Sequence, residues 1–398
     1  MSIMPFATLA PGSWSEAQRL ALFTRVLAGS TLFCLAFCWR LWLTRPIYPL
    51  VPVGGLIPPF PHPFDRLALA AFVGLLIAVM VRPRWRAGVW LLLAAFALFF
   101  LQDQNRAWPS FYQFFVLFLL LANHGGAKDE DSAGRVLAAM RFVLAAIYFW
   151  AGVAKLNPHF FHEEFPWFLE PLADRLPLEA SWLTAVAPLA AVLEVLIGVG
   201  LLTKRFRPPA VIAALAMHTL ILLCIGPLRG GWSNSSWAWG MTVAVQTVVL
   251  FAAAPDFRFQ KMCALAPRQR IVPAVVVLLI GVAPVLNRIN RWDSALSFNV
   301  YSGNISQAEI VIRGDAVEHL PARLQDHTTR YFGVGVLDLN EWSLAEFNAH
   351  VYPENRIFFA IYRRLCEYLP EGAAELRVVE KSGWFFPRRE RLYARPPE

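Results

Sequence analysis

Residues 148–157 read YFWAGVAKLN and place Lys155 at the end of an apolar helix that contains a glycine. A lysine at such a position is either an anchor, whose ammonium group extends to the water at the membrane edge, or a base held beside the lipid. An amine acts as a base at neutral pH only where an apolar cavity removes its water. The stretch therefore predicts a membrane helix, and both interpretations of its lysine stay open.

The composition of the whole chain supports a membrane protein. Hydrophobic residues make up 57% of the chain and charged residues 16%, whereas about a quarter of the residues of a soluble protein are charged. The 15 tryptophans and 31 phenylalanines suit membrane–water interfaces. The net charge of +8 comes from basic residues in short loops, which indicates orientation in a lipid bilayer and not binding to nucleic acid.

The apolar stretches predict the fold class. A transmembrane helix needs about 20 mainly apolar residues, and the chain approaches this at 20–43, 66–82, 87–102, 110–124, 134–155, 182–203, 209–227, 236–254 and 271–288. We therefore predict an all-α polytopic membrane bundle of about nine transmembrane helices in residues 1–289. A change of composition then predicts a small extracytoplasmic α+β domain in residues 290–398.

Basic loops set the expected orientation. The loops 82–86 (RPRWR), 203–209 (TKRFRPP) and 255–270 are rich in Arg and Lys, and nine spans put all three on one side. That side is the cytoplasm by the positive-inside rule. We therefore expect a protein of the bacterial inner membrane with a cytoplasmic N-terminus and an extracytoplasmic C-terminal domain. The acidic loop 123–133 neither supports nor contradicts this orientation.

Several segments outside the spans have patterns of their own. Alternating residues predict strands at 308–314 and 375–381, and helical spacing predicts helices at 342–350 and 353–369, with Pro353 in the first turn of the second. The proline-dense segment 44–65 predicts an extended strap on the outer face. The aromatic segment 156–181 predicts a short helix in the membrane interface.

Ionisable residues inside apolar spans are costly and mark interior sites. Arg141, Tyr148 and Lys155 recur every seven residues and share one helix face. Glu194 and His218 lie in the middle of the next two spans, so we expect them to meet near the midplane. These groups form either a proton relay with Lys155 as its base, or a buried polar network that joins helices.

Three outer loops, 102–113, 155–164 and 226–239, carry polar and aromatic residues. Their convergence predicts a substrate pocket with tryptophan walls; an ordinary aromatic belt is the alternative. The candidate binding residues are Asp103, Arg106, Trp108, Tyr112, Asn157, Asn234 and Trp237, together with Arg141 and Tyr148. No metal site is predicted, because His159, His162 and Glu163 lack a further ligand.

Residues 135–255 resemble the core of the HTTM and vitamin K-dependent gamma-carboxylase superfamily. The matching pieces are YFWAGVAKLN, then Glu194 in VLEVLIGVGLL and His218 in AMHTLILL. In the gamma-carboxylases, the second lysine of an AGVKKLD-like segment deprotonates reduced vitamin K. Lys155 matches that lysine, whereas Ala154 and Asn157 stand where the family has lysine and aspartate.

The resemblance implies that Lys155, Glu194 and His218 are catalytic and that the substrate or cofactor is a quinone, a quinol or another lipophilic molecule at the outer face. The substrate-peptide region of the animal enzymes is not recognisable in 290–398, so carboxylation of protein glutamate is not expected. The same region is distantly similar to DoxX-like membrane proteins, which implies a quinone-linked or accessory role.

Three functions are therefore open. The first is an enzyme that uses Lys155 as base. The second is a non-enzymatic scaffold or accessory subunit that presents its C-terminal domain to an extracytoplasmic protein partner. The third, a transporter, is disfavoured because the sequence shows no inverted repeat.

Overall fold

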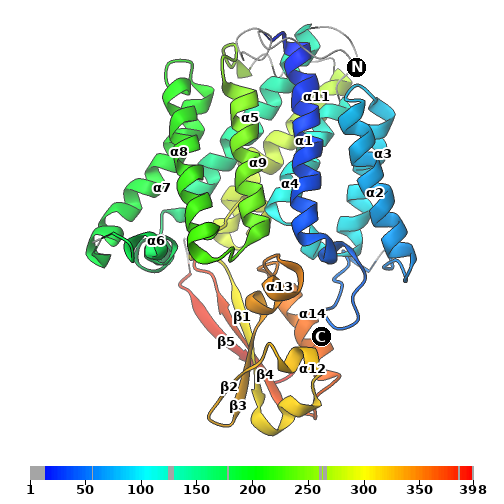
Figure 1. Cartoon of the computed structure of the whole chain (residues 1–398), viewed down its shortest axis with the longest axis vertical. Coiled ribbons are helices and arrows are strands. Elements are labelled where there is room, and N and C mark those ends of the chain that lie inside the picture. Colours follow the sequence, from blue (N-terminus) through cyan, green and yellow to red (C-terminus); the bar gives the residue numbers. More distant parts are fainter. Residues whose placement is uncertain are drawn as a thin grey trace.

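The computed structural model describes residues 14–55, 57–123, 130–176, 179–259, 262, 267–383 and 386–396. A bundle of helices forms one part of the molecule, and a smaller domain built on a β-sheet lies against one end of it (Figure 1). The start of α1 (Glu16–Cys38) lies at the far end of the bundle from this domain. The protein is thus mostly helical, with a small sheet near its C-terminus.

A helix lies in each of the nine predicted apolar stretches: α1 (Glu16–Cys38), α2 (Phe64–Val81), α3 (Arg86–Gln102), α4 (Pro109–Asn123), α5 (Glu130–Lys155), α7 (Ala180–Leu202), α8 (Arg207–Ile225), α9 (Asn234–Phe251), and α11 (Pro267–Val276) continued by η7 (Val277–Val282) and η8 (Ala283–Ile289). Among the described residues, six helices are long and apolar enough to cross a membrane: Glu16–Trp42, Phe64–Val81, Glu130–Lys155, Ser181–Leu202, Arg207–Arg229 and Ile271–Ile289. The first of these includes the short helix η3 (Trp39–Trp42), and the fifth includes η6 (Pro227–Arg229).

The helix α4 is short because it lies inside the bundle. Its 15 residues span about 22 Å, less than the roughly 30 Å of a hydrocarbon core. Almost all of its side chains are buried, including the polar Ser110 and Gln113. Gln113 donates to Gln246 Oε1 of α9 at 2.7 Å and accepts from Trp239 Nε1 at 2.9 Å. Other helices therefore surround α4, and its polar groups find partners there.

Two glycines bring α5 and α7 into close contact. A Cβ atom on Gly152 would lie 2.6 Å from Val195 N, and one on Gly198 would lie 2.7 Å from both Ala145 O and Phe149 N. Small residues allow helix backbones to approach, which favours packing between helices in lipid. The sequence motif around Lys155 thus positions α5 directly against α7.

Buried arginines cap helix ends at the end of the bundle that holds the start of α1. Arg19 of α1 donates to Val249 O at 2.7 Å and to Ala252 O at 2.9 Å, where α9 ends. Arg141 of α5 donates to Leu250 O at 2.8 Å. The last carbonyls of a helix have no partner within it, so cationic donors stabilise them.

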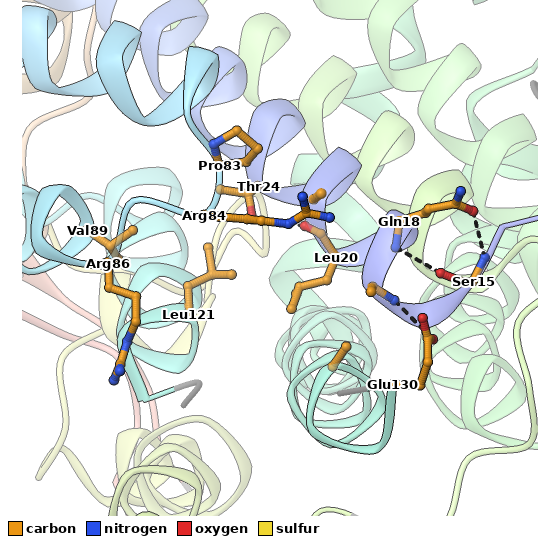
Figure 2. Close-up of a pocket in the computed structure, with 13 residues that line it drawn as sticks. Ser15, Gln18, Leu20, Thr24, Pro83, Arg84, Arg86, Val89, Leu121 and Glu130 are labelled. Carbon is orange, nitrogen blue, oxygen red and sulfur yellow. Dashed lines mark hydrogen bonds between the residues drawn. The ribbon is translucent and has the colours of Figure 1, made fainter. Parts of the chain in front are cut away.

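The three basic loops gather at this same end. Lys204 pairs with Asp256 at 3.2 Å, and Arg207 donates to Ala254 O at 2.7 Å. The loop 82–86 contributes Arg84 to a cavity of about 290 Å³ beside the start of α1. Figure 2 shows the Arg84 side chain extending across this cavity toward α1, whereas Arg86 points away from it. The loops are therefore far from the C-terminal domain.

The C-terminal domain is a five-stranded antiparallel sheet with order β2-β3-β1-β4-β5. The strands are β1 (Gln307–Arg313), β2 (Thr329–Tyr331), β3 (Val334–Asp338), β4 (Ala374–Glu380) and β5 (Arg389–Tyr393), with the short η10 (Gly314–His319) and α12 (Ala322–Gln325) between β1 and β2. The strands predicted at 308–314 and 375–381 are confirmed as β1 and β4. The other three were not predicted. β2 and β5 are largely exposed and lack apolar alternation, and β3 is only five residues long.

The two predicted helices of this domain are present with shifted ends. α13 (Leu339–Phe347) begins earlier than expected because Asp338 Oδ1 accepts from the amides of Asn340 and Glu341, both at 2.8 Å. It ends at Asn348, which has a φ of 53°. α14 (Asn355–Cys366) begins after its N-cap Glu354. The placement of Pro353 in its first turn was therefore wrong.

The proline-dense segment is a strap between the bundle and the C-terminal domain. Residues 43–55 and 57–63 form no helix or strand. Val53 N donates to Leu101 O of the bundle at 2.9 Å, and Arg364 of α14 donates to Pro46 O at 2.8 Å. A short helix is present in the segment predicted to lie in the membrane interface, as the π-helix η5 (Phe160–Glu164) and α6 (Phe165–Ala173) at the lower ends of α7 and α8 (Figure 1).

The glycine contact between α5 and α7 yields a prediction. Gly198→Ala puts a methyl group against Ala145 and Phe149 and should lower the free energy of unfolding by about 1–3 kcal/mol. Gly74→Ala in α2 is the matched control, because its added Cβ meets nothing within 4 Å. The control should be neutral or gain up to about 1 kcal/mol. Thermal unfolding of the detergent-purified chain measures both, and equal midpoints would contradict the contact.

Candidate functional site

Lys155 and Glu194 form an ion pair at the end of α5 that faces the C-terminal domain. Lys155 Nζ lies 2.8 Å from Glu194 Oε2, with side-chain exposures of 14% and 10%. Helical side chains tilt toward the helix N-terminus, so the lysine points back into the bundle and reaches the middle of α7. A second donor interaction reaches Ala151 O at 3.4 Å. The lysine is therefore enclosed and paired, and does not extend to water as an anchor.

A second buried group consists of Tyr148 of α5, His218 of α8 and Thr247 of α9. Tyr148 Oη lies 2.8 Å from His218 Nε2 and 2.9 Å from Thr247 Oγ1. The Thr247 hydroxyl donates to Val243 O at 2.8 Å, so it can only accept from Tyr148. Tyr148 Oη must then accept from His218 Nε2–H. This leaves His218 Nδ1 as a buried acceptor without a partner among the described residues.

Glu194 and His218 were predicted to meet, but the structure places them in different groups. Glu194 pairs with Lys155, and His218 hydrogen-bonds with Tyr148. The lysine side chain is long enough to reach Glu194 in the middle of α7 from the end of α5. All four residues nevertheless lie among α5, α7 and α8, as the helical spacing indicated.

A pocket of about 520 Å³ lies where the bundle meets the C-terminal domain. We call it the junction pocket. The predicted convergence of outer loops is present here, since Trp108, Glu164 and Trp232 come from the three loops. The other wall comes from the linker at 300–308 and from β3, α13 and the residues after it. Its polar and ring residues are Trp108, Glu163, Glu164, Trp167, Trp232, Tyr301, Ser302, Ser306, Gln307, Asp338, Asn340, Glu341 and His350.

His350 joins the two walls of the junction pocket. Its Nδ1 lies 3.0 Å from Asn340 Oδ1, and its Nε2 lies 3.2 Å from Tyr301 Oη and 3.3 Å from Ser233 Oγ. Its ring stacks on Trp108 with centroids 5.5 Å apart. Because Asn340 Oδ1 only accepts, the proton is on Nδ1, and Nε2 accepts from the Tyr301 hydroxyl. Burial lowers the pKa of His350 to about 4.

Glu164 connects the junction pocket with Lys155 electrostatically. Burial raises the pKa of the Glu164 carboxyl, and the positive charge of Lys155 opposes this rise. Lys155 itself does not line the junction pocket. The ion pair and the junction pocket are thus separate, adjacent features on either side of Glu164.

Of two further predicted binding residues, Asp103 holds the strap in place and Arg106 caps the ends of two helices. The carboxylate of Asp103 pairs with Arg45 and accepts from Asn105 Nδ2 at 2.8 Å. Arg106 donates to Leu41 O at 3.2 Å and to Phe99 O at 3.3 Å, where η3 and α3 end. Both side chains are almost fully buried. Their place in the structure is below the strap and outside the junction pocket.

The remaining predicted residues lie in other contacts. Tyr112 stacks on Phe298. Asn157 donates to Ser302 O at 3.0 Å and thereby attaches the end of α5 to the linker. The Asn234 amide donates to Asn348 Oδ1 at 3.2 Å. Trp237 packs on Phe33 and Gly226, and Arg141 lies near the middle of α5, about four turns before Lys155.

Sequence reasoning missed the contribution of the C-terminal domain to the junction pocket. Tyr301, Asp338, Asn340 and His350 carry no motif, and nothing in their spacing shows that the domain folds back onto the bundle. Trp167 was missed within the interfacial helix. The only available signal was the density of aromatic residues in the outer loops, which marked the correct end of the bundle.

The fold and these two features describe a mostly helical protein with helices long and apolar enough to cross a membrane, an enclosed lysine–glutamate pair, and a polar, aromatic junction pocket. Comparisons with protein-family models, with curated proteins and with solved structures found no match to the chain.

The buried histidine yields a prediction about pH. His350 has an ordinary pKa of 6.5 when unfolded and about 4 when folded, so the unfolded state binds more protons between these values. Stability should therefore fall as pH falls from about 6.5 to about 4, by an amount on the order of 2–3 kcal/mol. Thermal unfolding of wild type and His350→Gln across this range tests it. The difference between the two should shrink toward low pH, and parallel curves would contradict a neutral buried histidine.

Proposed function

We propose that the chain is an enzyme of the bacterial inner membrane with nine transmembrane helices, a cytoplasmic N-terminus and an extracytoplasmic C-terminal domain. Nine spans would place the N-terminus and this domain on opposite sides of the membrane, and the position of the start of α1, at the other end of the bundle from this domain (Figure 1), supports this. The gathering of the basic loops at the N-terminal end supports the orientation. The burial of α4 by its neighbours supports its inclusion among the spans.

The proposed reaction begins with removal of a proton from a quinol or another lipophilic substrate. The observation that carries this proposal is the Lys155–Glu194 pair at 2.8 Å. A charged pair in apolar surroundings can neutralise itself by moving one proton from Lys155 to Glu194. The free amine of Lys155 can then accept the proton of a substrate hydroxyl, which leaves an oxyanion and a lysine ammonium. The resemblance to the gamma-carboxylases supports the same role.

The surroundings of the pair suit a substrate dissolved in the bilayer. Val192, Leu193 and Leu196 are exposed on α7 around Glu194, where lipid would cover them. The pair itself is slightly exposed, so a molecule lying against α7 would need little rearrangement to reach it. A bound quinol would supply the acidic hydroxyl. Lys155 would hold that oxygen and take its proton, while the apolar neighbours exclude water.

Lys155→Arg tests the base directly. Arginine keeps the ion pair with Glu194 but cannot lose its proton, so activity should fall by about 10²–10⁴-fold while the fold persists. The assay is oxygen consumption by proteoliposomes supplied with reduced menaquinone, in which deprotonated quinol gives two electrons to dissolved oxygen and yields quinone and hydrogen peroxide. Lys204→Arg is the control, because Lys204 is 77% exposed at the other end of the bundle.

The outcomes separate the interpretations of Lys155. A large loss in Lys155→Arg, with an unchanged thermal midpoint and an active Lys204→Arg control, supports a base. Equal rates in both variants would end the proposal and leave the lysine as a link between α5 and α7.

One observation favours the second candidate, a non-enzymatic accessory subunit. The turn between β2 and β3 presents Tyr331, Phe332 and Val334 to solvent at the end of the domain far from the bundle (Figure 1). Exposed aromatic side chains at a loop tip suit a protein partner. On this hypothesis the domain binds an extracytoplasmic protein.

Photo-crosslinking in intact cells tests this hypothesis. A photoreactive residue in place of Phe332 should give one dominant adduct, whereas the same residue in place of the exposed Glu318 should not. Absence of an adduct at 332 would exclude this tip as the docking surface.

A further inference from the structure

We propose that the junction pocket binds a methylated ammonium group, carried by a soluble organic cation or by a lipid headgroup. The inference concerns a ligand site beside the Lys155–Glu194 pair and holds whether or not Lys155 acts as a base. Three properties of the lining lead to it: its charges, its rings and its size.

The charges of the lining are all negative. Glu163, Glu164, Asp338 and Glu341 line the junction pocket, and none of its described lining residues is lysine or arginine. This is unexpected in a chain with a net charge of +8. Of these four acids, only Glu163 pairs with an arginine among the described residues, since it lies 3.8 Å from Arg388 at the edge of the pocket. A concave site with one sign of charge concentrates ligands of the opposite sign.

Two of these carboxylates are partly buried. Burial raises the pKa of both Glu164 and Asp338. Asp338 Oδ1 accepts from the two amides at the start of α13, whereas the Glu164 carboxylate makes no hydrogen bond within the part of the chain that the structure describes. The nearby Lys155 is already paired with Glu194. A cation in the junction pocket would stabilise the charged form of both acids.

The rings specify the kind of cation. Trp108, Trp167, Trp232 and Tyr301 line the junction pocket, and the faces of such rings attract cations. Trp167 already does so, since Arg229 Cζ lies 4.2 Å from its centroid. Methyl groups on nitrogen spread the charge and lower its hydration, so a methylated ammonium leaves water for an aromatic wall more readily than a metal ion does.

The size of the junction pocket agrees with this ligand. Its volume of about 520 Å³ lies within the range of roughly 300–1,000 Å³ found for small-molecule sites. It therefore accommodates a methylated ammonium group together with the molecule that carries it.

Choline is the probe for the soluble source. The full chain is placed in nanodiscs of phosphatidylglycerol, which contains no ammonium group, and choline binding is measured by equilibrium dialysis. Saturable binding is expected, with no competition from dimethylbutanol, the uncharged isostere of choline. Retention of phosphatidylcholine in mixed nanodiscs, measured by native mass spectrometry, tests the lipid source.

Charge-removing variants locate the site. Glu164→Gln and Asp338→Asn should each weaken binding about tenfold or more, and asparagine preserves the helix cap that Asp338 provides. Glu318→Gln is the matched control, because Glu318 is exposed and lies outside the lining. It should leave binding unchanged.

Each outcome decides the proposal. Choline binding that depends on Glu164 and Asp338 supports a soluble cation. Retention of phosphatidylcholine with the same dependence, without choline binding, supports a headgroup. Binding of neither probe would overturn the proposal, and so would equal binding of dimethylbutanol and choline. These results do not depend on the menaquinol assay, so either proposal can fail while the other stands.

Discussion

The carbonyl groups at the ends of helices are the constraint on which this bundle depends. Inside an apolar bundle these carbonyls have no water, and each needs a donor from another part of the chain. Arg19 and Arg141 supply donors to the end of α9, Arg207 supplies them near the end of α7, and Arg106 does so for α3. These arginines connect distant helices, and carboxylates also lie beside Arg141 and Arg106. Arg106 and Arg141, which the sequence suggested as binding residues, thus donate to the ends of helices.

Lys155 has a different environment. Its principal partner is a carboxylate on a neighbouring helix, so its charge is balanced by a group that can itself take up a proton. Gly152 and Gly198 allow this arrangement because they bring α5 and α7 within backbone contact. The same motif that contains the lysine thus also sets the distance to its partner. An arginine in the same place could form the pair but could not release a proton.

The docking of the C-terminal domain creates the junction pocket. Asn348 donates to Phe37 O at 3.2 Å and accepts from the Asn234 amide, while Asn157 holds the linker. His350 then contacts residues of both the bundle and the domain. Each of these contacts uses a polar group that needs a partner once water is excluded. The position of the domain on the bundle and the shape of the junction pocket are therefore coupled.

The sequence by itself determined the apolar character that suits a membrane, the positions of nine apolar helices, and the strands β1 and β4. These follow from local periodicity and composition, which burial in lipid or in a sheet requires of any chain. Only the tertiary structure decided that Glu194 pairs with Lys155, that Asp103 holds the strap while Arg106 caps α3, and that His350 and Asp338 reach the junction pocket. Such pairings depend on side-chain reach and on the docking of segments far apart in the chain. Residue spacing along the sequence carries no record of either.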